Sequence, residues 1–115
     1  MIGYEMRPVA LTDFEFMVLL AVLRVGEEAY GVPIAREIEQ TAGRKVIVAA
    51  VYASLVRLQE KGLVSSTIGE PTQERGGRAK RFFKVTAKGL RSIRETQRAF
   101  TALWTGVPAL KGGVA

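Results

Sequence analysis

Val46-Ile-Val-Ala-Ala-Val-Tyr-Ala-Ser-Leu-Val-Arg-Leu-Gln-Glu-Lys-Gly-Leu-Val64 is the stretch that decides the fold of this 115-residue chain. Its apolar residues recur at the spacing of one helix face, at Val48, Val51, Leu55 and Leu58. This spacing predicts a helix from about residue 48 to residue 61 that buries one face in a core. Lys61 and Gly62 are typical of a helix C-terminus, where a basic residue and a glycine stop the helix.

Two short segments after this helix alternate between apolar and polar residues, at 64–68 and 81–85, and can pair as strands. The connection between them is rich in Gly and Pro and becomes basic towards its far end. Helix, strand, basic connection and strand make the plan of a winged helix, in which one helix enters a DNA groove and the connection grips the neighbouring backbone.

Three more helices complete the predicted fold. Thr12 followed by Glu15 is a capping box, which predicts a first helix to about Val25. That helix is apolar nearly all round, so either a second subunit covers part of it or it is a fully buried central helix. A second helix has Pro33 at its first position and ends at 41–43; with the third it forms a helix-turn-helix.

Thr86 is expected to cap the last helix, which runs to about residue 105. A heptad-like stripe lies along it, made of Leu90, Ile93, Gln97, Phe100, Leu103 and Trp104. Because so small a domain leaves no core for this stripe, we predict a homodimer interface there. The fold class is therefore mainly α with a two-stranded β wing: a winged helix-turn-helix DNA-binding domain at 1–85 with an N-terminal arm at 1–11, a dimerisation helix at 86–106 and a flexible tail at 107–115.

Charge and composition narrow the function. The chain carries 17 Lys and Arg against 11 Asp and Glu, a net charge of +6, and residues 75–98 hold nine basic groups and one acid. Such a basic region favours double-stranded DNA as the partner. The absence of Cys and His removes the usual metal ligands and general bases, so we predict no metal, no cofactor, no catalytic residues and no enzyme. The most apolar stretch, 14–25, is too short to cross a bilayer and no basic region precedes it, so we predict no membrane partner and a cytoplasmic protein.

The exposed face of the third helix has almost no side chain that can hydrogen-bond a base edge. The residues predicted to meet DNA there are Ala49, Ala50, Tyr52, Ala53 and Arg57. Small side chains allow close approach and contact with thymine methyls; the alternative is that this face packs on another protein. The Tyr52 hydroxyl can donate to a phosphate, or the ring can simply pack. The predicted phosphate contacts are Arg44 and Lys45 before the helix, and Arg75, Arg78, Lys80 and Arg81 in or beside the wing.

These residues resemble the PadR family of bacterial transcriptional regulators. The resemblance spans 11–104 and rests on Tyr30-Gly31, on the run 51–64, and on Arg75-Gly-Gly-Arg-Ala-Lys-Arg-Phe-Phe-Lys-Val-Thr86 with the following Ala87-Lys-Gly89. It implies a winged helix-turn-helix dimer that binds palindromic operators, usually as a repressor, with the last helix as the dimerisation element. One helix after the wing is typical of the short subfamily.

Two departures from the family pattern stand out. Ala49-Ala50 replaces a frequent Gly-Thr, and Phe82-Phe83 stands where many members have a tyrosine. Some short members bind flat, apolar, often cationic compounds between the subunits. By that resemblance Phe14, Met17, Phe100 and Trp104 are candidate contacts for a small aromatic or cationic effector, and simple dimer packing is the alternative for each.

The sequence thus predicts a transcriptional repressor that binds DNA as a homodimer. The alternatives are a small-molecule-binding or protein-docking module without strong operator specificity, and an architectural protein that bends DNA without sequence preference.

Overall fold

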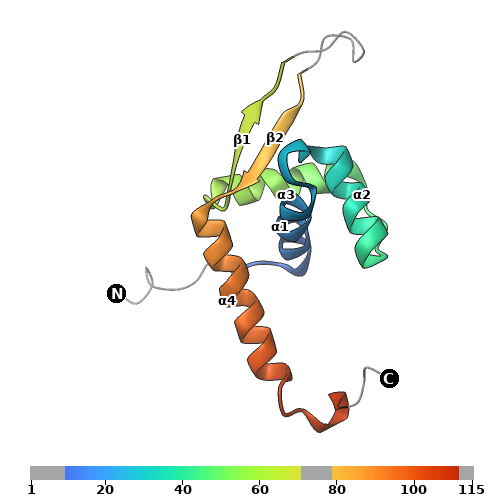
Figure 1. Ribbon diagram of the computed structural model, residues 1–115, viewed down its shortest axis with the longest axis vertical. Coiled ribbons are helices and arrows are strands. Elements are labelled where there is room, and N and C mark those ends of the chain that lie inside the picture. The colour runs from blue at the N-terminus through green and yellow to red at the C-terminus, as the bar shows by residue number, and fades with distance from the viewer. Residues whose placement is uncertain (1–9, 71–78, 112–115) are drawn as a thin grey trace.

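The computed structural model describes residues 10–70 and 79–111. The elements follow in the order α1 (Asp13–Val25), η2 (Gly26–Glu28), α2 (Gly31–Ala42), α3 (Val48–Glu60), β1 (Val64–Ile68), β2 (Arg81–Val85), α4 (Ala87–Trp104) and η4 (Pro108–Leu110). The first three helices pack together beside the strand pair, and α4 runs away from this body (Figure 1). The fold is mainly helical with a two-stranded antiparallel wing, as predicted.

Local capping motifs account for the ends of α1 and α3. The Thr12 hydroxyl accepts from the Glu15 amide and the Glu15 carboxylate accepts from the Thr12 amide, both at 3.0 Å, so the predicted capping box is confirmed. At the end of α3, the Gly62 amide donates to the Gln59 carbonyl and the Leu63 amide to the Leu58 carbonyl. Gly62 has a φ of +79°, which the Schellman ending of a helix requires.

The start of α2 differs from the prediction. The helix begins at Gly31, so Pro33 is its third residue and not its first. Pro33 still costs no hydrogen bond there, because the first four amides of a helix lack an intrahelical partner. Tyr30 is the N-cap and contributes no side-chain cap.

The strands pair in antiparallel register from Val64 opposite Val85 to Ile68 opposite Arg81. On the open side of β2, the Phe83 amide donates to the Ala29 carbonyl at 2.8 Å, so the segment after η2 borders the sheet. The core draws on all three packed helices, the sheet and the start of α4; its largest buried apolar members include Leu19, Ile34, Leu55, Leu58, Leu63, Phe83 and Ile93.

Two apolar residues are not where the helix periodicity predicts them. Val48, predicted for the core face of α3, is 41% exposed, because it is the first residue of the helix and its side chain packs only in part, beside Gly31 at the start of α2. Ile93, predicted for the intersubunit stripe, is buried in the core of its own chain. The start of α4 packs against this domain through Gly89, Ser92 and Ile93, so the domain does have core for the first part of the stripe.

Part of the predicted tail forms a turn after α4. Gly106 turns the chain with a φ of +86°, and Pro108–Leu110 forms one 3-10 turn. The Val107 amide donates to the Trp104 carbonyl at 3.2 Å and the Leu110 amide to the Val107 carbonyl at 3.1 Å, which continues the chain directly from α4.

Candidate nucleic-acid interface

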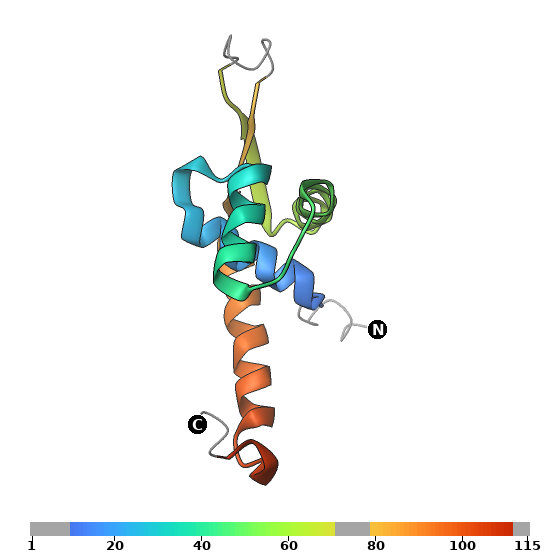
Figure 2. The same ribbon diagram turned by 90° about the vertical axis from the view of Figure 1, so that its right-hand side faces the viewer.

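Helix α3 stands out from the molecule beside the strands, and Figure 2 views it almost along its axis. Its inner face, with Val51 and Leu55, is fully buried. The residues at helical spacing on the opposite face, Ala49, Ala53 and Val56, are exposed. Ala50 is half-buried at the edge of this face. A helix that is packed on the core along one face and exposed along the opposite face is suited to insertion into a DNA groove.

The flank of α3 that faces α1 carries two cations, which share one buried carboxylate. The Lys61 ammonium donates to both oxygens of Glu15, at 3.0 and 3.1 Å, and the Arg57 Nε lies 3.5 Å from Oε2. Lys61 also donates to the Ala10 carbonyl at 3.3 Å. Arg57, predicted to reach DNA, is half-exposed, but its guanidinium is drawn to the α1 side of the helix.

The Glu15 carboxylate is ionised in this setting. Burial raises its pKa, but the Thr12 amide and the Lys61 and Arg57 cations stabilise the charged form, and the net pKa lies below the ordinary value. Because Thr12 precedes α1 and Arg57 and Lys61 lie at the end of α3, the carboxylate joins the start of α1 to the end of α3.

We expect Glu15→Gln to lower the free energy of unfolding by about 1–3 kcal/mol near pH 7, since the amide leaves two cations without their counter-charge. Gln can still accept from the Thr12 amide, so the variant isolates the charge. A lowered folded-state pKa gives stability above the ordinary glutamate pKa that is lost as the pH falls through the lowered pKa. In urea unfolding, the difference between the two proteins should therefore shrink between about pH 5 and pH 3.

Glu37→Gln is the matched control. The Arg24 side chain and the Thr41 hydroxyl also hold the pKa of Glu37 below its ordinary value, but this carboxylate lies at the surface. Its removal should have the smaller effect of a surface ion pair. A Glu15→Gln deficit that is the same at pH 7 and pH 3 would contradict the role given to the charge.

Two basic residues precede α3. The Arg44 guanidinium lies 3.2 Å from the exposed carboxylate of Asp13 and 5.8 Å from the centre of the Phe14 ring. Lys45 is exposed. Both therefore lie beside the N-terminal end of α3, where the sequence places them, and Arg44 already has a protein partner.

At the wing, aromatic rings pack beside the start of β2. The Lys80 ammonium lies 4.5 Å from the centre of the Tyr30 ring, and Tyr30 packs edge-on against Phe82. Arg81 begins β2 and is half-buried. The predicted contacts Arg75 and Arg78 lie outside the described residues.

Tyr52 lies on the flank of α3 that faces the wing. Its ring packs edge-on against Phe83 at 6.0 Å, and 43% of the residue is exposed. Packing and an accessible side chain therefore coexist, and the structure leaves both predicted roles of Tyr52 open.

The second half of α4 is uncovered in the single chain. Leu90 is half-buried and Gln97 exposed, and the apolar side chains beyond them are the most exposed large ones of the helix: Phe100 at 62%, Leu103 at 76% and Trp104 at 63%. These three continue, at helical spacing, the face that Gly89 and Ile93 bury in the domain.

One chain alone does not bring the four candidate effector contacts together. Met17 lines a hollow of about 420 Å³ between α1 and α2. Trp104 lines another, of about 270 Å³, with residues of η4. Phe14 lies half-buried under Arg44, and Phe100 is exposed on α4.

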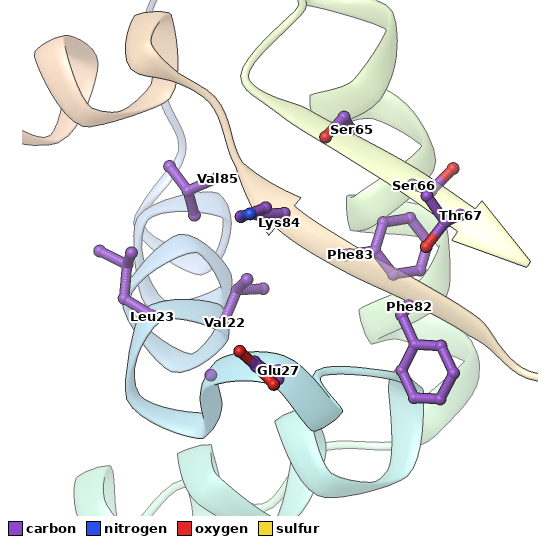
Figure 3. A pocket seen from close by; sticks show the side chains of 11 residues that line it. Val22, Leu23, Glu27, Ser65, Ser66, Thr67, Phe82, Phe83, Lys84 and Val85 are labelled. Carbon is purple, nitrogen blue, oxygen red and sulfur yellow. The ribbon is translucent and has the colours of Figure 1, made fainter. Parts of the chain in front are cut away.

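A further hollow, of about 470 Å³, lies between the end of α1 and the sheet. Figure 3 shows Val22 and Leu23 of α1 on one side of it, and Lys84 and Val85 of β2 on the other. Of the predicted DNA and effector contacts that the structure describes, none lines it.

The sequence profile of the transcriptional regulator PadR-like family matches residues 19–95, which include α2, α3, both strands and the start of α4. The chain belongs to the PadR-like family. Its members are transcriptional regulators and not enzymes, in agreement with the predicted class. No curated protein matches the chain significantly.

Solved structures share the fold over nearly the whole chain. A PadR-like transcription factor from Bacteroides fragilis is 23% identical, with a TM-score of 0.67 over 99% of this chain and 98% of that one. A PadR family regulator from Eggerthella lenta is 24% identical, with a TM-score of 0.66 over 85% of each chain. A PadR-like regulator from Bacillus cereus is 23% identical, with a TM-score of 0.65 over 84% of this chain and 89% of that one.

Residues that the sequence reasoning missed are Glu15 and Lys61 as a buried ion pair, and Gly89 as a close contact. The only local signal for Glu15 was its place in the capping box, which explains its bonds with Thr12 but not its contacts with Lys61 and Arg57. Within residues 10–70 and 79–111, no helix has the length and apolarity needed to span a bilayer.

Proposed function

We propose that this PadR-like regulator represses transcription as a homodimer that binds a palindromic operator. Residues 1–85 form the DNA-binding domain: α3 enters the major groove, and Arg44, Lys45 and the basic wing contact the flanking phosphates. The observation that carries this proposal is the exposed face of α3, with basic side chains before the helix and at the wing, on a chain of net charge +6.

The dimer follows from the uncovered half of α4. The second half of this helix extends beyond the domain that buries its first turns (Figure 1), and its large apolar side chains are exposed. Exposed clusters of this kind mark contact sites, and a helix that projects alone is best covered by its own copy. Residues 86–106 then form the dimerisation helix, and two-fold symmetry sets the two half-sites about 34 Å apart.

A small flat, apolar or cationic effector between the subunits is the proposed means of regulation. Phe100 and Trp104, with Phe14 and Met17 from either subunit, are the candidate contacts. Such a compound needs only to bind one separation of the two α3 helices better than another to relieve repression.

A selection from random duplex DNA at about 0.15 M salt tests the proposal directly. We expect the retained duplexes to share a palindromic motif. Retained duplexes without a motif, whose binding merely fades as salt rises, would instead support the alternative of a module or architectural protein without operator specificity.

Lys80→Ala with Arg81→Ala tests the wing within the same experiment. In salt titrations, the double variant should bind every duplex more weakly. The negative slope of log K against log salt should shrink in magnitude by about two at most, since two phosphate contacts are lost. Arg91→Ala with Arg94→Ala removes the same charge from exposed positions of α4 and should change the slope less. Equal slopes for the wing double variant and the wild type would contradict the phosphate contacts.

A further inference from the structure

The surface of α3 carries an apolar patch at the position where the proposed function requires contact with DNA. Val56 is 44% exposed on the outer face of the helix, and Ile47, the N-cap residue of α3, is 71% exposed. The exposed alanines Ala49 and Ala53 lie between them. In a small basic domain with its own packed core, uncovered β-branched side chains on a projecting helix indicate a partner with apolar groups.

Two polar side chains that border this patch have partners within the chain. Arg57 is ion-paired with the buried Glu15 on the α1 side, and the Tyr52 ring leans against Phe83 on the wing side. Glu60, which continues the exposed face, offers only carboxylate oxygens that phosphates repel. The centre of the face therefore has contact area but no hydrogen-bond donor of its own.

The basic residues around the patch indicate which kind of partner is complementary to it. Arg44 and Lys45 precede it, and Lys80 and Arg81 lie at the wing, so an apolar centre is flanked by cations at both sides. A DNA major groove has the complementary arrangement, with phosphates along its rims and base edges on its floor. The one apolar group that the four base pairs expose on that floor is the C5-methyl of thymine.

We propose that Ala49, Ala53 and Val56 read the operator through thymine methyl groups. This inference rests on the proposed function, and it gives that function a chemical specificity: thymines at fixed, symmetry-related positions of both half-sites, recognised by apolar contact and not by hydrogen bonds from α3. The alanines permit the close approach, and Val56 supplies the largest contact.

Deoxyuridine tests the proposal on the unaltered protein, since it lacks only the C5-methyl and keeps every hydrogen-bonding group of thymine. The probes are the selected operator duplex and copies with single thymines replaced. We expect uracil at a contacted thymine to weaken binding about fourfold, the factor equivalent to ~0.8 kcal/mol for one methyl-sized group removed from water. Replacement of thymines in the spacer between the half-sites should leave affinity unchanged.

Val56→Ala then locates the contact. Compared on the same two duplexes, the variant should distinguish thymine from uracil at one position by less than twofold. Val32→Ala, which shortens an exposed valine of α2, should keep the full fourfold ratio. Because each protein is compared with itself on two duplexes, a general loss of stability in a variant does not affect the ratio.

The outcomes separate this inference from the proposed function. A selection without any motif contradicts operator binding itself. A clear motif that lacks thymine in the half-sites, or one on which uracil binds within twofold of thymine at every position, leaves the operator standing and overturns the methyl readout.

Discussion

Trp104→Asp is expected to leave the chain monomeric and to weaken operator binding by at least about a hundredfold. Trp104 is 63% exposed in the single chain and lies in the uncovered half of α4 with Phe100 and Leu103. A tryptophan buried at an interface is a frequent hot spot, and a two-fold interface loses two copies of it in this variant. We therefore expect the free energy of dimerisation to weaken by about 4 kcal/mol, which raises the dimer dissociation constant about a thousandfold. The aspartate adds an unpaired charge to the same place.

Operator binding should fall with the dimer because the second half-site is then no longer bound within one assembly. Linked binding raises the overall affinity by about 10²–10⁴ over a single module, and a monomer loses this factor. Sedimentation gives the assembly state, and a titration of operator DNA against a single half-site gives the affinity ratio. The domain itself should remain folded, since Trp104 does not belong to the buried core.

Ala102→Asp is the matched control, with the same charge introduced two residues earlier on the opposite face of α4. Ala102 is exposed and lies away from the apolar stripe, so this variant should remain dimeric and should bind the operator with little change. A Trp104→Asp protein that stays dimeric would place the interface somewhere other than the exposed half of α4.

Local signals in the sequence predicted the elements well, because short-range chemistry determines them. The capping box at Thr12 and the glycine after α3 act within a few residues, and both ends were predicted correctly. Periodicity predicted which faces of the helices are apolar. It does not say what covers each face, and Ile93 shows this. The stripe on α4 is continuous, but its first part is buried in the chain's own core, whereas Phe100, Leu103 and Trp104 of its second part are exposed.

The candidate site was predicted less completely because its key contacts are distant in sequence. Glu15 and Lys61 are 46 residues apart, and no local pattern links them. The Arg57 guanidinium shares the same carboxylate, and no local pattern predicts that contact either. The sequence therefore indicated which residues surround α3, whereas only the fold reveals which of them are already engaged.

Gly89→Ala is expected to destabilise the protein by about 2 kcal/mol, although alanine is the better helix former. A Cβ at this position would lie 2.2 Å from the Leu63 carbonyl oxygen and 2.7 Å from a Val85 methyl. Relief requires α4 to move away from the corner between α3 and β1, and overpacking of this kind costs about 1–3 kcal/mol or more. The gain in helix propensity, about 1 kcal/mol, offsets only part of this.

The same movement would strain the hydrogen bonds of Thr86, which join the start of α4 to the segment that follows α3. Its amide donates to the Leu63 carbonyl at 3.0 Å, its hydroxyl donates to the Gly62 carbonyl at 2.7 Å, and that hydroxyl accepts from the Gly89 amide at 3.0 Å. Thermal unfolding should show a midpoint lower by about 10 °C. Gly31→Ala is the control, because a Cβ there meets only a Val48 methyl at 3.1 Å, and a side chain that is 41% exposed can shift.

Gly89 also determines where α4 points, so its substitution tests the link between fold and function. If α4 forms the dimer, a displaced α4 changes the separation of the two α3 helices, and Gly89→Ala should lose affinity for the two-half-site operator more than for a single half-site. If Gly89→Ala has wild-type stability and the same ratio of operator to half-site affinity as the wild type, the start of α4 can shift without consequence. The close contact with Leu63 then does not set the geometry of the dimer.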